Sequence, residues 1–181
     1  MSAEGPLPAG VEVRPAEAEE EPVLANLLEL YTHDFSEIVD LQLKPDGRFG
    51  YPRLALYWRE EGRFPFLVRV DGNLAGFALV SKGSEISGDP GVWDMAEFFV
   101  ARGWRKRGIG AAVAHEIWRR FPGPWEVRVL EGNHAARAFW ASAVDAFTRG
   151  SAETYIHGTP ERRWQVFSFL SRDNRVPRPS N

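Results

Sequence analysis

The stretch VARGWRKRGIGAAVAHEIWRRF, residues 100–121, carries the strongest signal in this chain. An apolar run ends at Val100, a basic loop follows at residues 105–107, and Gly108 and Gly110 open an amphipathic helix. Glycines at a strand-to-helix turn let the backbone approach a bulky anion, and the amides of the first helical turn point toward it. Flanking cations add charge-assisted hydrogen bonds. The stretch predicts a phosphate or pyrophosphate site, and spacing alone leaves a plain tight turn as the alternative.

Two better-known phosphate motifs do not fit these glycines. A dinucleotide fingerprint needs a third glycine where Val113 stands, and its turn follows the first strand, whereas this turn follows the fourth predicted strand. A P-loop ends in Gly-Lys-Ser/Thr, and here Gly110 is followed by Ala111. A different nucleotide-binding enzyme that uses the same turn stays an alternative.

The composition is that of one globular domain. The chain has 181 residues, of which 44% are hydrophobic and 26% charged, which is enough for a sizeable core. Its net charge of −3 disfavours nucleic acid, and the lack of cysteine excludes disulfides and thiolate nucleophiles. The N-terminus lacks the pattern of a signal peptide, and no apolar run approaches the roughly 20 residues of a membrane span. We therefore expect a cytoplasmic protein without membrane contact.

Hydrophobic periodicity and turn residues predict alternating strands and helices. Residues 71–73, Asp-Gly-Asn, are a hairpin signal, and residues 157–160 predict a turn between the last two strands. We expect strands at residues 11–14, 63–70, 74–81, 92–100, 125–130, 147–156 and 164–170, and helices from about residue 19, over 54–60, after Gly110 and after Asn133. This order predicts an α/β domain over residues 11–171, between a flexible arm (1–10) and a flexible tail (172–181).

Three segments resemble the GNAT superfamily of N-acetyltransferases. Residues 105–110, Arg-Lys-Arg-Gly-Ile-Gly, are similar to its Arg/Gln-x-x-Gly-x-Gly/Ala signature. Residues 95–100 resemble the fourth strand of that family, and the pattern Asn133-x-x-Ala136-x-x-Phe139-Trp140 resembles the helix that follows. The resemblance implies the GNAT fold: a mixed, mostly antiparallel sheet of about six to seven strands, flanked by helices and splayed at the cofactor site.

The resemblance also implies acetyl-CoA as the acyl donor, and no metal. The amides of residues 106–111 would hold the CoA pyrophosphate, and the backbone of residues 98–100 would pair with the pantetheine arm. Asn133 would lie near the pantetheine, unless it is only a helix N-cap, and residues 105–107 are otherwise an ordinary solvated loop. The residues implied in cofactor binding are Phe98, Phe99, Val100, Arg105, Lys106, Arg107, Gly108, Ile109, Gly110, Ala111, Asn133 and Trp140.

Acetyl transfer to an amine needs a base, because a lysine-like amine has a pKa of about 10.4 and attacks only after losing a proton. Glu97 and Asp94 lie where the resemblance places that base. Alternation along the strand would put Asp94 beside Phe98 on one face and Glu97 beside Met95 on the other, so only one would face the acceptor. We favour Glu97, with Asp94 as the second candidate; either is otherwise a structural carboxylate. The resemblance also implies a backbone N–H near Val100 as the donor to the developing oxyanion.

One position departs from the family pattern. Many members have tyrosine where this chain has Trp140, and an indole N–H donates a hydrogen bond without giving up its proton. Trp140 would orient the thioester or pack in the core, and the proton for the leaving thiolate would come from water or Tyr155. The four histidines form no constellation, and His115 is expected at the surface, on the polar face of its helix.

By the same resemblance, residues 32–57 and 155–163 would grip the acceptor. The first segment carries acidic and aromatic side chains that suit a cationic amine, although a solvated helix and loop explain them as well. These residues are His33, Asp34, Glu37, Asp40 and Asp46, among Phe35, Phe49, Tyr51 and Tyr57.

The predicted function is an acyl-CoA-dependent N-acetyltransferase that moves an acetyl group to a small-molecule or peptide amine by direct attack in a ternary complex. A covalent acyl-enzyme is not expected, because the chain has no cysteine. The alternative is a catalytically weak CoA-binding sensor of the same fold, for which Trp140 is the best argument. Unpaired strand edges of such a sheet also allow a homodimer.

Overall fold

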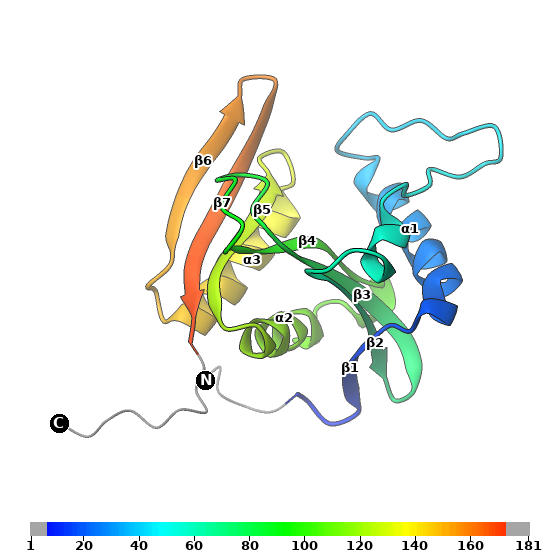
Figure 1. Ribbon diagram of the computed structural model, residues 1–181, viewed down its shortest axis with the longest axis horizontal. Helices are drawn as coiled ribbons and strands as arrows, with labels where there is room; N and C mark the ends of the chain where they lie inside the picture. The colour runs from blue at the N-terminus through cyan, green and yellow to red at the C-terminus, as the bar shows by residue number, and fades with distance from the viewer. Residues whose placement is uncertain (1–6, 173–181) are drawn as a thin grey trace.

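The computed structural model describes residues 7–172, which form one seven-stranded sheet with helices on both faces (Figure 1). The strand order is β1-β2-β3-β4-β5-β7-β6, and every neighbouring pair is antiparallel except β4 and β5. The strands are β1 (Val11–Pro15), β2 (Arg63–Val70), β3 (Asn73–Lys82), β4 (Trp93–Val100), β5 (Gly123–Leu130), β6 (Glu153–Thr159) and β7 (Arg162–Ser171). The helices are α1 (Glu21–Phe35), α2 (Ile109–Arg120) and α3 (His134–Thr148), with 3₁₀ turns η1 (Ala18–Glu20), η2 (Leu54–Trp58) and η3 (Arg102–Trp104). The predicted mixed, mostly antiparallel sheet is confirmed.

The predicted arm at residues 1–10 and tail at residues 172–181 fall mostly outside the described residues. The helices and strands themselves run from Val11 to Ser171. Within residues 7–172, no helix is long and apolar enough to cross a membrane.

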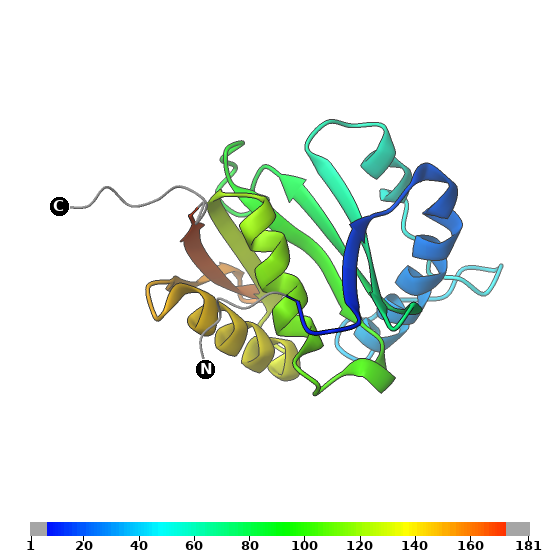
Figure 2. The ribbon, with the colours of Figure 1, turned by 90° about the horizontal axis from the view of Figure 1, so that it is seen from below.

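Two hydrophobic clusters pack on the two faces of the sheet. On one face, α1 and η2 cover β2 to β4 through side chains such as Leu24 and Tyr57. On the other face, α2 and α3 pack through Ile117, Trp118 and Val144. The sheet therefore separates α1 from α2 and α3 (Figure 2). The central strands read as continuous apolar runs because both of their faces are covered.

The turn between β2 and β3 is tighter than predicted. Asp71 and Gly72 have positive φ angles of 49° and 77°, as a two-residue type I′ turn requires. Asn73 already pairs with Val70 and so belongs to β3. The expected hairpin is confirmed, with a turn one residue shorter.

A β-bulge at Ala96 changes which face the carboxylates of β4 occupy. Met95 pairs with Val80 and Glu97 with Leu79, so Ala96 is an extra residue in the ladder. Simple alternation is therefore wrong beyond this point. Ser81, the partner of Asp94, shares a face with Leu79, so Asp94 and Glu97 lie on the same face of the sheet, the face that α1 covers. Met95 instead packs in the opposite cluster.

Strand β6 begins later than the sequence indicated, at Glu153, whereas β7 begins two residues earlier than expected, at Arg162. Helix α3 runs to Thr148, and Phe147 packs its ring against Trp118 at 5.0 Å between centroids. The aromatic residue that suggested a strand is therefore part of the apolar face of a helix. Residues 157–159, predicted as a turn, belong to β6, and the chain reverses at residues 160–161.

His115 is buried rather than exposed, with 7% of its surface accessible. Its Nε2 lies 2.8 Å from the Ala143 carbonyl oxygen, and its ring packs against Trp118 and Phe147. The expected surface position is wrong because α3 covers this face of α2. Burial lowers the pKa of His115, only partly opposed by the bond to Ala143.

We expect His115 to make the protein less stable in acid. The lowered pKa means that the folded state binds fewer protons than the unfolded state, so this contribution is complete above the unfolded pKa of about 6.5 and is lost as the pH falls below it. The fall in Tm between pH 7.5 and pH 5.0 should be smaller in His115→Gln than in the wild type, relative to each protein's own Tm at pH 7.5. The exposed His134→Gln serves as the control and should follow the wild type. An unchanged fall in His115→Gln would contradict this account.

Candidate functional site

The sheet splits between β4 and β5. These parallel strands pair only at the start of β4, through Trp93 and Asp94, although β4 continues to Val100. Past Asp94, no strand among residues 7–172 pairs with the edge of β4 that faces β5. An unpaired edge offers backbone donors and acceptors to an extended ligand. The predicted splay is confirmed.

The amides of Phe98 and Val100 point into this gap. The Ala101 N–H donates to the Ala75 carbonyl oxygen at 2.8 Å, so that amide faces β3. Hydrogen-bonding direction alternates along a strand, so the Phe98 and Val100 amides face the other way. The carbonyl oxygen of Val100 is occupied, because Arg105 Nε donates to it at 2.6 Å.

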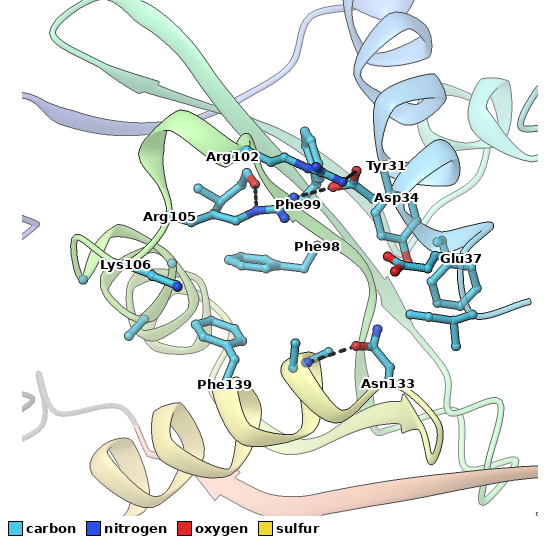
Figure 3. A pocket seen from close by; sticks show the side chains of 18 residues that line it. Tyr31, Asp34, Glu37, Phe98, Phe99, Arg102, Arg105, Lys106, Asn133 and Phe139 are labelled. Atoms are coloured by element: carbon cyan, nitrogen blue, oxygen red, sulfur yellow. Dashed lines mark hydrogen bonds and ion pairs between the residues drawn. The ribbon is translucent and has the colours of Figure 1, made fainter.

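A cavity of about 560 Å³, here called the turn cavity, lies between this edge, the glycine turn and the end of α1 (Figure 3). Phe98 of β4 and Phe139 of α3 border it with stacked rings, 5.9 Å between centroids. Lys106 points into it from the turn. Its lining consists of Tyr31, Asp34, Phe35, Glu37, Ile38, Phe98, Phe99, Val100, Arg102, Arg105, Lys106, Gly108, Gly110, Ala111, Asn133, Ala135, Ala136 and Phe139.

Gly108 and Gly110 are required for different structural reasons. Gly108 caps α2 in the left-handed conformation, with φ of 76°, which costs other residues free energy. Gly110 lies inside the helix, where a Cβ would come within 3.1 Å of the Phe139 ring. The first intrahelical bond runs from Ala112 N to Gly108 O, so the three amides before Ala112 have no helical partner. Together with the helix dipole they form an anion-binding end.

Two of the loop cations are already paired with α1. Arg102 and Arg105 each donate to Asp34, at 2.7 Å to separate carboxylate oxygens. Burial works to raise the pKa of Asp34, but both guanidiniums together lower it. Arg107 stacks on the Trp104 ring at 5.2 Å and does not line the turn cavity. Lys106 is therefore the cation of the predicted basic triplet that faces the cavity without an ion pair among the described residues.

A second cavity of about 550 Å³, here called the Glu97 cavity, adjoins the first. The two cavities share Tyr31, Phe35, Phe98, Asn133 and Ala136. The rest of its lining comes from α1 and the loop after it, η2, β2 to β5, the loop after β3, β7 and α3: Thr32, Leu41, Gly50, Tyr51, Pro52, Arg53, Tyr57, Arg63, Ser81, Glu85, Met95, Ala96, Glu97, Arg128, Val129, Leu130, Trp140, Arg162 and Trp164.

Glu97 is held at this junction by two tyrosines. The Tyr51 hydroxyl donates to Glu97 Oε1 at 3.1 Å, and Tyr31 donates a second hydrogen bond. Burial raises the pKa of Glu97, against the tyrosine donors and the charge of Arg128, which lower it. Burial and the Glu97 carboxylate raise the pKa of both tyrosine hydroxyls, so they stay protonated. The result is a carboxylate with raised basicity at the meeting point of the two cavities.

Asp94 lies deeper on the same face. The residue is 1% exposed, and its Oδ2 accepts from Arg128 Nη2 at 3.1 Å, while Oδ1 has no partner among the described residues. Burial raises its pKa to about 6, although Arg128 opposes this. Asp94 lines neither cavity, so Glu97 is the carboxylate that a ligand can reach.

Most of the residues implied in cofactor binding converge on the turn cavity. Those that line it are Phe98, Phe99, Val100, Arg105, Lys106, Gly108, Gly110, Ala111 and Asn133. The side chain of Ile109 is instead buried in the core, and Arg107 lies outside the lining. Asn133 caps α3 by accepting from the Ala136 amide at 3.0 Å, and it also lines both cavities. The predicted roles as a helix N-cap and as a neighbour of the pantetheine are therefore compatible.

Of Trp140 and Tyr155, Trp140 lies beside a cavity, as part of the lining of the Glu97 cavity. Trp140 is 7% exposed and packs edge-on against Phe98, which supports the packing interpretation. Tyr155 lies on β6, where its hydroxyl is 3.5 Å from Glu126, and it lines neither cavity.

The acidic residues expected around the acceptor have mostly local partners. Asp40 accepts from Gln42, and Asp46 accepts from the Arg48 amide. Asp34 and Glu37 line the turn cavity, not the Glu97 cavity. Of the four arginines that line the Glu97 cavity, Arg53 and Arg162 lie within the segments predicted to grip the acceptor, although neither was named there. Arg63 and Arg128 lie on other strands, and no motif links the four.

The chain belongs to the GNAT acetyltransferase family. The model of the Acetyltransferase (GNAT) family matches residues 24–144, which include most of α1, the glycine turn and most of α3. No curated protein shows significant similarity to the chain.

Solved structures share the fold at low sequence identity. An acetyltransferase from Thermus thermophilus has a TM-score of 0.68 at 12% identity, covering 88% of this chain and 96% of its own. A Salmonella typhimurium protein provisionally assigned as an acetyltransferase, with its cofactor acetyl-CoA, has a TM-score of 0.63 at 13% identity, covering 94% and 99%. An aminoglycoside acetyltransferase in complex with coenzyme A and kanamycin has a TM-score of 0.60 at 13% identity, covering 88% and 94%. Within residues 7–172, no group of three or more His, Asp or Glu side chains is arranged to hold a metal ion.

Replacing Gly108 with alanine should destabilise the turn. An alanine at φ of 76° costs about 1 kcal/mol of the free energy of unfolding. Urea denaturation followed by circular dichroism measures this difference. Gly103→Ala is the matched control, because its φ is not in the left-handed region and a Cβ there meets no atom within 4 Å. Equal stability of the two variants would show that Gly108 is not held in this conformation.

Proposed function

We propose that this chain is an acyl-CoA-dependent N-acetyltransferase that transfers an acetyl group from acetyl-CoA to an amine within a ternary complex. The observation that carries the proposal is the junction of the two cavities. An anion-binding helix end and an unpaired strand edge border one cavity, and a partly buried carboxylate of raised pKa opens into the other. Acyl donor and amine would therefore meet beside Phe98 and Glu97.

The turn cavity suits acetyl-CoA. The free amides at the start of α2 and the Lys106 ammonium would hold the pyrophosphate. One of the Phe98 and Val100 amides would pair with the extended pantetheine arm, as a strand pairs with a sheet edge, which leaves the other for the thioester carbonyl. The acetyl-CoA and coenzyme A in two of the neighbouring structures support this assignment.

Glu97 would act as the general base. Its carboxylate takes a proton from the substrate ammonium, and its raised pKa makes this transfer less unfavourable. The neutral amine then attacks the thioester carbonyl, and a β4 amide at Phe98 or Val100 donates to the developing oxyanion. As the C–S bond breaks, the second amine proton passes through water to the thiolate. Tyr31 and Tyr51 hold Glu97 in place and, because their own pKa values are raised, do not supply that proton.

The sensor alternative predicts binding without turnover. It draws on Trp140, which is packed in the core where many family members carry a tyrosine. Release of CoA from acetyl-CoA in the presence of an amine separates the alternatives, because a sensor binds the donor but releases no thiol above the hydrolytic background.

Replacing Glu97 with glutamine should lower kcat at pH 7.5 by about 100-fold, since general base catalysis typically contributes 10²- to 10⁴-fold. The rate of CoA thiol release with a panel of primary amines measures this effect. The wild-type rate should rise with pH as Glu97 loses its proton, and this limb should vanish in Glu97→Gln. Asp94→Asn is the comparison on the same face of β4, and we expect a smaller loss, because Asp94 lines neither cavity. A large loss in Asp94→Asn with little change in Glu97→Gln would assign the base to Asp94.

Reversing the charge of Lys106 should weaken acetyl-CoA binding. We expect the Kd of Lys106→Glu, measured by calorimetry, to rise about tenfold, which corresponds to about 1.4 kcal/mol. The control is Arg107→Glu, which changes the charge equally next to it but outside the cavity lining, and should change Kd about two- to threefold. Equal effects would mean that the loop acts only through its overall charge.

A further inference from the structure

The Glu97 cavity is lined by more positive than negative side chains. Arginines reach it from four separate elements, and the carboxylates in its lining are fewer. Its charged residues are Arg53, Arg63, Arg128 and Arg162 against Glu85 and Glu97. A carboxylate that binds a substrate ammonium is thus set among guanidiniums, which is unfavourable for a ligand that carries only positive charge.

Three of these arginines are partly neutralised by neighbours. Arg53 pairs with Glu85 at 2.9 Å, at the exposed rim of the cavity. Arg128 Nη2 lies 3.1 Å from both Glu85 and Asp94. Arg63 donates through Nε to Glu60, which does not line the cavity.

Arg162 differs from the other three. Its guanidinium lies 5.1 Å from the centre of the Trp164 ring, and it makes no ion pair within residues 7–172. The next residue, Arg163, is paired with Glu131 at 2.7 Å and does not line the cavity. Arg162 thus has N–H donors available to a ligand in the cavity, beside the Trp164 ring that Arg128 also approaches, at 5.4 Å.

The walls between these charges are aromatic. Tyr31, Tyr51, Tyr57 and Trp164 line the cavity, and its volume of about 550 Å³ fits a small molecule. Flat rings beside a carboxylate bind an ammonium group well, and guanidinium forks bind carboxylate or phosphate oxygens.

We infer that the acceptor is a small amine that also carries an anionic group, with its ammonium at Glu97 and its carboxylate or phosphate at Arg162. This inference rests on the proposed function and specifies the substrate class of the same site. It differs from the kanamycin complex of the neighbouring structure, because a polycation would meet the arginines of this cavity without compensating charge. A zwitterionic amine satisfies both ends of the cavity.

The test compares acceptors that differ only in the anionic group. CoA release is measured with glycine, β-alanine, 4-aminobutyrate and L-phenylalanine, each beside its primary amide, and with O-phosphoethanolamine beside ethanolamine. We expect at least one acid to exceed its neutral partner by about tenfold or more in kcat/KM. A preference among the amino acids points to a carboxylate, and a preference for O-phosphoethanolamine points to a phosphate.

Variants assign the preference to the cavity. Arg162→Gln, at an exposed position that leaves the fold intact, should bring the acid-to-neutral ratio close to one by raising KM for the acid. Arg163→Gln is the matched control, one residue along the same strand, and should keep the wild-type ratio. If neutral amines are equal to or better than the acids, or if Arg163→Gln abolishes the preference as fully as Arg162→Gln, the inference is overturned.

A binding measurement separates this inference from the proposed function. The same acceptor pairs are added to the protein with saturating CoA, and Tm is recorded. Acids that raise Tm more than their neutral partners, with the difference lost in Arg162→Gln, support the inference even if no acceptor releases CoA, in which case the proposed enzyme activity fails alone. If neutral amines are acetylated and acids are not preferred, the proposed acetyltransferase activity is supported, and the inference of a zwitterionic acceptor is contradicted.

Discussion

After Trp93 and Asp94, strands β4 and β5 no longer share hydrogen bonds, and the sheet opens. The rest of the site depends on this separation. Both strands stay anchored, because β3 pairs with β4 to its end and β7 pairs with β5 along its length. The sheet therefore loses only the backbone hydrogen bonds between β4 and β5, past the start of β4. It exposes the Phe98 and Val100 amides beside the start of α2, so strand edge and helix end present donors to the same ligand.

The bulge at Ala96 sets the electrostatics of the other cavity. One extra residue in β4 brings Glu97 and Asp94 to the same face, where Arg128 from β5 lies near both. Asp94 keeps Arg128 in place at the bottom, while Glu97 faces the ligand with two tyrosine donors. Without the bulge the two carboxylates would occupy opposite faces, and Glu97 would lose either its tyrosines or its neighbour Arg128. A local irregularity of the backbone thus places two carboxylates of raised pKa on one face, of which Glu97 lines the cavity and Asp94 does not.

Features written in contiguous residues were predictable from the sequence. The glycine turn, its basic loop and the Asn133 cap each depend on neighbours within a few positions, and the order of strands and helices follows from periodicity. The contacts around Glu97 could not be predicted from the sequence, because Tyr51 is 46 residues away in the chain and no motif links the two residues. The bulge was missed because alternation assumes an uninterrupted ladder. His115 was misplaced because a single helix does not reveal that a later helix will cover its polar side. The arginines of the Glu97 cavity, drawn from four elements, are brought together only by the tertiary fold.

The central claim is that acetyl-CoA pairs with the free edge of β4 and caps the start of α2. Hydrogen–deuterium exchange of the protein with and without acetyl-CoA tests it most directly. The account predicts slower exchange of the amides of residues 98, 100 and 106–111 on adding acetyl-CoA, with the amides of β6 on the far edge of the sheet unchanged. Protection that appears elsewhere in the chain, and leaves residues 98–111 exchanging at the free rate, would contradict it.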